Sequence, residues 1–145
     1  MEEPLYIDDQ NSGSKRWAIV ADEGDSVWLY LTEPESTRPI ADCWLLNKVP
    51  APDDITKYKD AKSAPAATKA YVSPNALRPV PSEEDVEICW SADGNSVAVL
   101  LEGEVLGFIA AGSKYGWSKE LVCDGPFGKP LNIKLYLELF GGSLH

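Results

Sequence analysis

The sequence has one histidine, three cysteines and no long apolar run, and these absences exclude several functional classes. The histidine is His145, the last residue, so the body of the chain has no imidazole to act as a general base or bind a metal. The cysteines Cys43, Cys89 and Cys123 show no C-x-x-C spacing and lie beside apolar residues, which indicates reduced, packed thiols. A catalytic thiol would need a base partner. We therefore expect no metal, no cofactor and no enzymatic activity.

Membranes and nucleic acids are also poor partners for this chain. No apolar run approaches the about 18 residues of a membrane-spanning helix, and the start Met-Glu-Glu-Pro lacks the basic and apolar regions of a signal peptide. The chain carries 13 basic and 23 acidic residues, a net charge of −10, which repels phosphate backbones and anionic lipids. We expect a cytoplasmic protein whose acidity either serves solubility alone or matches a basic partner.

The residues that are present predict a mostly β fold, with α+β as the alternative. A chain of 145 residues, 44% of them hydrophobic, is long enough to bury a core as one domain. Residues 16–21 and 26–32 are rich in aromatic and β-branched residues and flank the turn sequence Asp-Glu-Gly-Asp, so we expect them to form a hairpin. Residues 40–46 predict a third strand of the same kind.

A second group of strands is predicted after the middle of the chain. Residues 85–91 alternate between apolar and polar, with Val86, Ile88 and Trp90 expected to point inward. An Asp-Gly turn and a later Glu-Gly-Glu turn connect them to two further strands, so that residues 85–110 predict a three-stranded antiparallel meander.

Near the end of the chain, residues 131–139 carry Leu or Ile at every second position. The segment lies between Pro130 and Gly141, and helical spacing fits it less well than strand spacing. It therefore predicts a long strand with one buried face.

The strands are expected to form one domain over residues 16–142. Residues 1–15 are polar and predict a flexible N-terminal arm, and residues 143–145 are interpreted as a vector remnant. Six prolines interrupt residues 47–82, which predict a long insertion loop with one short helix over residues 54–62. Residues 48–81 hold six basic and three acidic side chains, whereas the remainder holds seven and twenty, so the body and not the insertion is expected to make functional contacts.

Two clusters of carboxylates are candidates for a binding surface. One comprises Asp22, Glu23 and Asp25, and the other runs from Glu83 to Glu87. Neither has the spacing of a calcium loop, so solvated turns are the default interpretation, with a cation site or a glycosidase pair as alternatives.

Aromatic residues on one expected strand are candidate anchors. Val27, Leu29 and Leu31 share one face of the strand, and Trp28 and Tyr30 share the other. Either both faces are covered, or the aromatic face is available for binding.

Three stretches resemble a family of uncharacterised small bacterial proteins. They are residues 16–31, residues 42–49 (Asp-Cys-Trp-Leu-Leu-Asn-Lys-Val) and residues 81–104, which include Val-Glu-Ile-Cys-Trp-Ser-Ala-Asp-Gly-Asn. In that family a strand ending in Trp-Ser-x-Asp-Gly leads into an apolar strand, a glycine turn and a further strand. The resemblance covers about residues 16–120, interrupted by the insertion. It implies a fold and supplies no catalytic residue.

In size, acidity and β content the chain is also similar to the immunity proteins that bacteria make against their own secreted toxins. This similarity implies a non-enzymatic protein whose acidic surface meets a basic toxin, with aromatic side chains as anchors. A small-ligand or scaffold domain, with a pocket between sheet and insertion, is the first alternative, and a hydrolase that uses only carboxylates is the second. The sequence does not predict the oligomeric state. The residues expected at the partner contact are Asp22, Glu23, Asp25, Trp28, Tyr30, Glu83, Glu84, Asp85 and Trp117.

Overall fold

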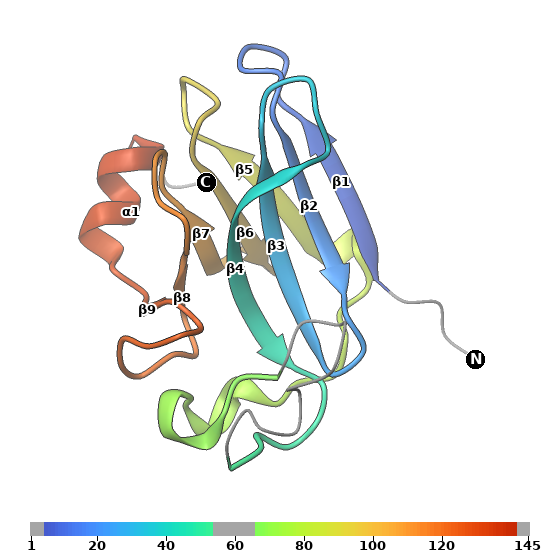
Figure 1. Ribbon diagram of the computed structural model, residues 1–145, viewed down its shortest axis with the longest axis vertical. Helices are drawn as coiled ribbons and strands as arrows, with labels where there is room; N and C mark the ends of the chain where they lie inside the picture. The colour runs from blue at the N-terminus through green and yellow to red at the C-terminus, as the bar shows by residue number, and fades with distance from the viewer. Residues whose placement is uncertain (1–4, 54–65, 142–145) are drawn as a thin grey trace.

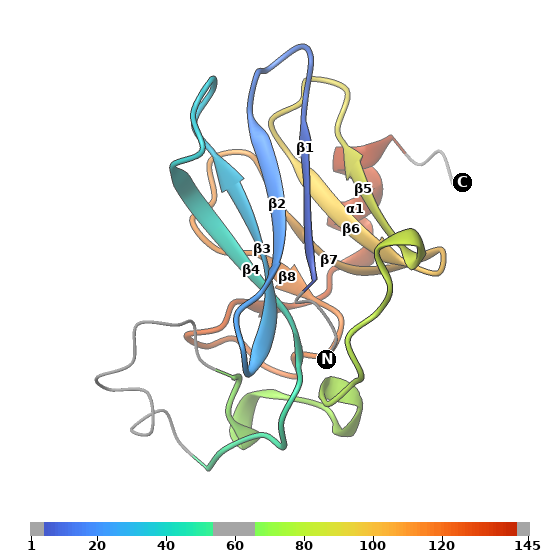
Figure 2. The same ribbon diagram turned by 90° about the vertical axis from the view of Figure 1, so that its right-hand side faces the viewer.

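The computed structural model describes residues 5–53 and 66–141, which form two β-sheets, one short helix and several 3-10 turns. The two sheets lie face to face, and the helix covers the outer side of the second sheet (Figures 1 and 2). The predicted mostly β class is confirmed.

The first sheet has four antiparallel strands in chain order. The hairpin predicted over residues 16–32 is formed by its second and third strands, with Val20 opposite Leu29, and the strand predicted at residues 40–46 is its fourth. The strands are β1 (Tyr6–Gln10), β2 (Trp17–Asp22), β3 (Ser26–Thr32) and β4 (Pro39–Asn47).

Strand β1 corrects the expectation of a flexible arm over residues 1–15. Its five residues pair with β2, from Tyr6 opposite Ala21 to Gln10 opposite Trp17. Leu5 is buried in the core, and Ile7 packs against the same cluster. The polar composition misled the prediction because an edge strand needs few apolar residues: only Leu5 and Ile7 face inward on apolar neighbours.

The second sheet begins with the predicted meander, which is confirmed. Val86 lies opposite Leu101 and Val97 opposite Ile109, and Val86, Ile88 and Trp90 pack against the core as expected. A short parallel pair of strands then completes the sheet. The five strands are β5 (Val86–Trp90), β6 (Val97–Leu101), β7 (Glu104–Ile109), β8 (Trp117–Ser118) and β9 (Lys129–Pro130).

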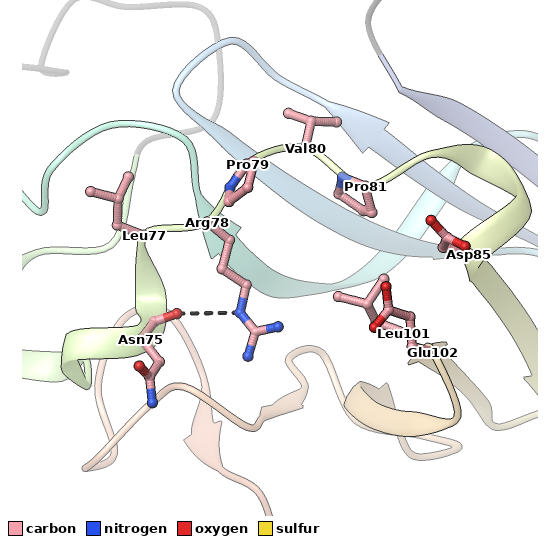
Figure 3. Close-up of a pocket in the computed structure, with 9 residues that line it drawn as sticks. All are labelled: Asn75, Leu77, Arg78, Pro79, Val80, Pro81, Asp85, Leu101 and Glu102. Atoms are coloured by element: carbon pink, nitrogen blue, oxygen red, sulfur yellow. Dashed lines mark hydrogen bonds between the residues drawn. The ribbon is translucent and has the colours of Figure 1, made fainter.

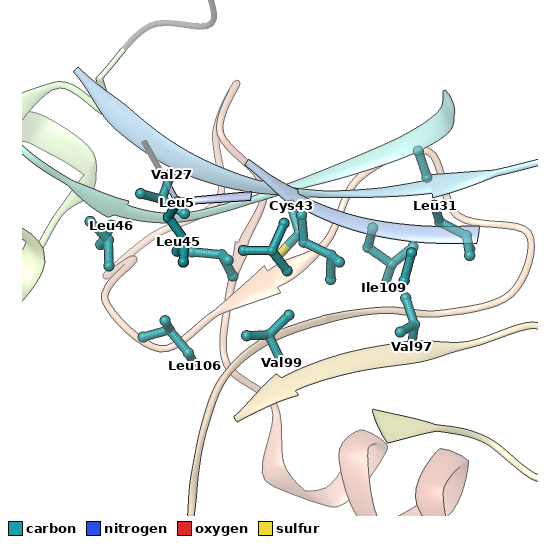
Figure 4. Close-up of a cluster of buried hydrophobic side chains, with 14 residues drawn as sticks. Leu5, Val27, Leu31, Cys43, Leu45, Leu46, Val97, Val99, Leu106 and Ile109 are labelled. Carbon is teal, nitrogen blue, oxygen red and sulfur yellow. The ribbon is translucent and has the colours of Figure 1, made fainter. Parts of the chain in front are cut away.

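The main core lies between the sheets. The core side chains that face each other across it show which strand ends of the two sheets lie at the same end of the molecule. Val27 and Leu46 of the first sheet lie near Leu106 of the second, whereas Leu31 lies near Val97 and Ile109 (Figure 4). The β2–β3 turn therefore lies at the same end as the β6–β7 turn. We call this end the acidic end, for the carboxylates described below.

The sheets approach closely where β4 meets β7 and β8, and two glycines permit the approach. A Cβ atom at Gly116 would lie 2.5 Å from Cβ of Cys43 and 2.7 Å from the carbonyl oxygen of Phe108. At Gly107 it would lie 2.9 Å from both Sγ of Cys43 and a methyl carbon of Leu45. Any larger residue at either position would have to push the sheets apart.

The strand predicted at residues 131–139 is wrong, because the segment forms helix α1 (Ile133–Phe140). The Asn132 side chain accepts a hydrogen bond from the backbone N–H of Leu135, and Gly141 ends the helix at φ 83°. Leucine, lysine and glutamate favour helices, and leucines four residues apart share a helix face. Leu131, Leu135 and Leu139 therefore pack over Phe108 together with Tyr136 and Phe140.

The insertion is irregular in its described part, as predicted, with 3-10 turns η2 (Lys69–Tyr71), η3 (Pro74–Ala76) and, just after it, η4 (Glu83–Asp85). The helix expected over residues 54–62 lies outside the described residues. The Asn47 side chain holds the returning segment, because it accepts from the N–H of Ala67 and donates to the carbonyl of the same residue. The insertion therefore packs on the outer face of the first sheet.

Candidate functional site

In the β2–β3 turn, the carboxylates of Asp22 and Glu23 take part in local structure. Asp22 forms an ion pair with Lys48 at 2.7 Å, and its side chain is only 6% exposed. Glu23 accepts a hydrogen bond of 2.8 Å from the Tyr30 hydroxyl. The backbone carbonyl of Asp25 accepts from the N–H of Lys48. The interpretation of this turn as solvated is thus wrong for Asp22, whose charge is neutralised and largely buried.

Trp28 lies in a second hydrophobic cluster on the outer face of the first sheet. Its ring is 6% exposed, packs with Trp44, Leu121 and Phe127, and donates from its indole N–H to Ser26 Oγ at 2.8 Å. The insertion and the loop between β8 and β9 cover it. This ring is a core residue and leaves no face for a partner, so the covered alternative applies here.

Tyr30 and Trp117 are half-buried, and neither projects freely. Burial, followed by the hydrogen bond to Glu23, raises the pKa of Tyr30 well above its usual value. Trp117 stacks on Phe108 with ring centroids 5.1 Å apart and ring planes within 8°. Tyr115, 6.2 Å from Trp117 between centroids, is the more exposed ring of this group. Trp117 is therefore held by packing within the fold.

The second carboxylate cluster is placed differently, because it is exposed. Glu83, Glu84 and Asp85 form η4 at the acidic end, immediately before β5. Within residues 5–53 and 66–141, none of these three side chains forms an ion pair.

Glu102 adds a fourth carboxylate that the sequence analysis did not propose for the site. It lies in the β6–β7 turn, and its backbone N–H donates to the carbonyl of Asp85 at 3.0 Å. The signal for it was present, because an antiparallel β5–β6 pair that matches Val86 with Leu101 puts Asp85 opposite Glu102. Glu102 also has φ 51°, a conformation that residues other than glycine, asparagine and aspartate adopt rarely.

A cavity of about 360 Å³ lies beside Asp85 and Glu102 (Figure 3). Arg78 extends into it from the insertion, and its guanidinium donates to the carbonyl of Asn75 at 3.3 Å and to Oε2 of Glu120 at 2.6 Å. Glu120 is 5% exposed and also accepts from Ser73 Oγ at 2.6 Å. The lining residues are Asn75, Leu77, Arg78, Pro79, Val80, Pro81, Asp85, Leu101 and Glu102.

Three cations near the acidic end, all within residues 5–53 and 66–141, are engaged in ion pairs. Lys48 pairs with Asp22, Arg78 with Glu120, and Lys119 with Glu104 at 2.7 Å. Within the described part of the chain, each of these pairs neutralises one acidic group, and none provides a counter-charge for Glu83, Glu84, Asp85 or Glu102. The acidic end therefore presents a local excess of negative charge.

The described ranges contain no cluster of metal-ligating side chains, and two of the three thiols are made less reactive by their surroundings. Residues 5–53 and 66–141 contain no group of three or more metal-ligating side chains. Burial raises the pKa of Cys43 to about 12 and, together with the Glu87 carboxylate, that of Cys89 to about 11, so both thiols are protonated near neutral pH. Cys123 is exposed, which corrects the expectation that all three cysteines are packed. The three form no disulfide with one another.

Comparisons with protein-family models, with curated proteins and with solved structures give no match. Among the described residues, no helix has the length and apolar character needed to span a membrane.

Proposed function

We propose that this protein is a non-enzymatic binding protein, a cytoplasmic bacterial immunity protein that neutralises a toxin by direct contact with a basic surface. The observation that carries the proposal is that Glu83, Glu84, Asp85 and Glu102 lie at one end of the molecule and form no ion pair with any other described residue. Like charges held together oppose folding, and an opposite charge on a partner relieves that repulsion.

The placement of the charges supports a role in association. These carboxylates lie on an exposed 3-10 turn and on a neighbouring β-turn, so their electrostatic field extends into solvent. Such a field increases the association rate with a cation-rich protein. The aromatic anchors expected earlier are not part of this proposal, because Trp28 is core and Trp117 stacks on Phe108. The resemblance to small bacterial proteins and the similarity to immunity proteins agree with a domain of this kind.

A small-ligand-binding protein is the second candidate, and one observation favours it. The cavity between the insertion and the β6–β7 turn falls within the about 300–1,000 Å³ typical of ligand pockets. Its walls combine apolar surface with a few charged groups, as ligand pockets commonly do.

The proposal predicts that a gene beside this protein's gene encodes a toxin, and the test uses that toxin. We expect co-expression of the chain to restore the growth of cells that make the toxin. The purified proteins should associate at a rate that falls steeply with salt, because exposed charges are screened beyond a Debye length of about 8 Å at physiological ionic strength. The variant Glu83→Lys/Glu84→Lys should associate at least about tenfold more slowly, with little change in melting temperature.

The matched control reverses two carboxylates at the opposite end. Glu33→Lys/Glu35→Lys changes the net charge by the same amount in and beside the β3–β4 turn. It should slow association much less. Equal association rates for the two variants, or no protection of cells by the unaltered chain, would overturn the proposal.

A further inference from the structure

The cavity at the acidic end has a rigid apolar wall. Val80 packs against the main core and anchors the segment from Leu77 to Pro81, while Leu101 of β6 contributes apolar surface from the second sheet (Figure 3). Two prolines fix the backbone of that segment. The wall is thus formed before any ligand arrives, which lowers the entropy lost on binding.

The same wall presents few hydrogen-bond donors. Proline has no backbone N–H, so Pro79 and Pro81 offer only carbonyl oxygens. The N–H of Glu102 is already bonded to Asp85, and that of Arg78 to the carbonyl of Asn47. These four lining positions therefore offer carbonyl acceptors and no free backbone N–H, which favours ligands that donate hydrogen bonds.

The charge of the cavity favours cationic ligands over anionic ones. Arg78 is the cation of the lining, and the carboxylate of Glu120 neutralises it. Asp85 and Glu102 remain, so the cavity with its neighbour Glu120 has a net charge of about −2. An anion would meet repulsion, whereas a cation would gain two charge-assisted hydrogen bonds.

We propose that this cavity binds an alkyl ammonium or alkyl guanidinium group, in the form of one basic side chain of the protein partner. The cationic head lies between Asp85 and Glu102, and its aliphatic stem lies along Pro79, Pro81 and Leu101. This inference rests on the proposed function and deepens it, since it names the group of the partner that enters the domain. A free cation such as a polyamine or agmatine shares this chemistry and is the other source.

The experiment is an NMR titration of the full chain labelled with ¹⁵N. The probes are agmatine, an acetylated and amidated Gly-Arg-Gly peptide, and the same peptide with citrulline in place of arginine. Citrulline has nearly the shape of arginine and no charge. We expect the arginine peptide to shift the amides of residues 77, 78, 80, 85 and 101–103, and the citrulline peptide to shift them at least about tenfold more weakly.

Three variants test the residues. Asp85→Asn and Glu102→Asn should each raise the dissociation constant of the arginine peptide about tenfold, the loss expected for one charge-assisted hydrogen bond. Glu35→Gln removes the same charge at the opposite end of the molecule, outside the lining, and should change that constant less than twofold. Shifts of equal size for the arginine and citrulline peptides, or an equal effect of Glu35→Gln, would overturn the inference. Agmatine binding more tightly than the peptide would identify a free cation as the ligand, against a partner side chain.

The experiments can reject the cavity inference and the proposed function independently of each other. If the toxin binds and Glu83→Lys/Glu84→Lys slows its association, while the cavity amides stay unshifted in the complex, the cavity inference is wrong and the proposed function stands. If agmatine binds in the cavity while the neighbouring toxin does not bind the protein, the proposed function is wrong and the chemistry assigned to the cavity stands.

Discussion

The guanidinium of Arg78 and the carboxylate of Glu120 are 2.6 Å apart and join the insertion to the loop between β8 and β9. Ser73 reaches the other oxygen of the same carboxylate, so two insertion residues hold one acidic group. The pair therefore fixes one wall of the cavity relative to the second sheet.

We expect Glu120→Gln to lower the free energy of unfolding by about 2 kcal/mol, because it leaves a partly buried guanidinium without its counter-charge. Glu104→Gln removes the exposed carboxylate of the Lys119 pair and should leave the free energy of unfolding close to that of the unaltered protein. Urea denaturation of the two variants measures the difference. Equal midpoints would show that the Arg78 pair is no stronger than a surface pair.

Glu102→Asn should stabilise the protein by about 1 kcal/mol, because asparagine adopts positive φ at lower cost and Asn-Gly suits this turn. Glu35→Asn replaces another glutamate, at φ 57°, and should stabilise the protein in the same direction. Glu102→Gln removes the charge and keeps the strained backbone, so it isolates the electrostatic part. Thermal melting of the three variants separates these contributions, and a lower melting temperature for Glu102→Asn would contradict the prediction.

Gly116→Ala should lower the free energy of unfolding by about 3 kcal/mol, since the new methyl group would overlap the Cys43 side chain and the Phe108 carbonyl. Gly112→Ala meets no atom within 4 Å but has φ 82°, so only the backbone cost of about 1 kcal/mol applies. Chemical denaturation compares the two. If Gly112→Ala were the more damaging variant, the close approach at β4 would not be the constraint described above.

Alkylation at one pH should distinguish the three cysteines by the rates at which they react. At pH 8, iodoacetamide is expected to modify Cys123 first, Cys89 slowly and Cys43 least, because the pKa values of the last two are raised to about 11 and about 12. The raised pKa of Cys43 also means that folding favours its protonated form, so its contribution to stability is complete at neutral pH and is lost as the pH rises toward 12. Mass spectrometry of the modified chain gives the order, and denaturant should make all three react alike. Modification of Cys43 before Cys123 under native conditions would contradict the assignment.

The strands were predictable where alternation and turn chemistry agreed. Asp93-Gly94 and Glu102-Gly103 mark turns whose lengths fix the register of β5, β6 and β7. The same reasoning gave a wrong prediction for residues 131–139. Apolar residues at every second position fit a strand, but they also place leucines four residues apart, which is the spacing of one helix face. The capping residues Asn132 and Gly141 resolve the ambiguity.

The site was predictable only in part. Two of the five cavity or cluster carboxylates described above, Glu102 and Glu120, were not assigned to it from the sequence. The first follows from strand register, whereas the second depends on how the insertion folds back to bring Arg78 beside Glu120. The core position of Trp28 also arises from contacts across the chain, with Leu121 and Phe127. No local pattern encodes such contacts.

Strands β1 and β5 end the two sheets, and both carry acidic side chains: Asp8 and Asp9 on β1, Glu87 on β5. Asp9 additionally accepts a hydrogen bond from the indole of Trp90, which ties the two edges together. An incoming strand from another copy would bring its own carboxylates alongside these, and the repulsion would oppose its addition. We therefore expect the carboxylates on these two edges to oppose strand addition, and so to reduce self-association of the protein at high concentration.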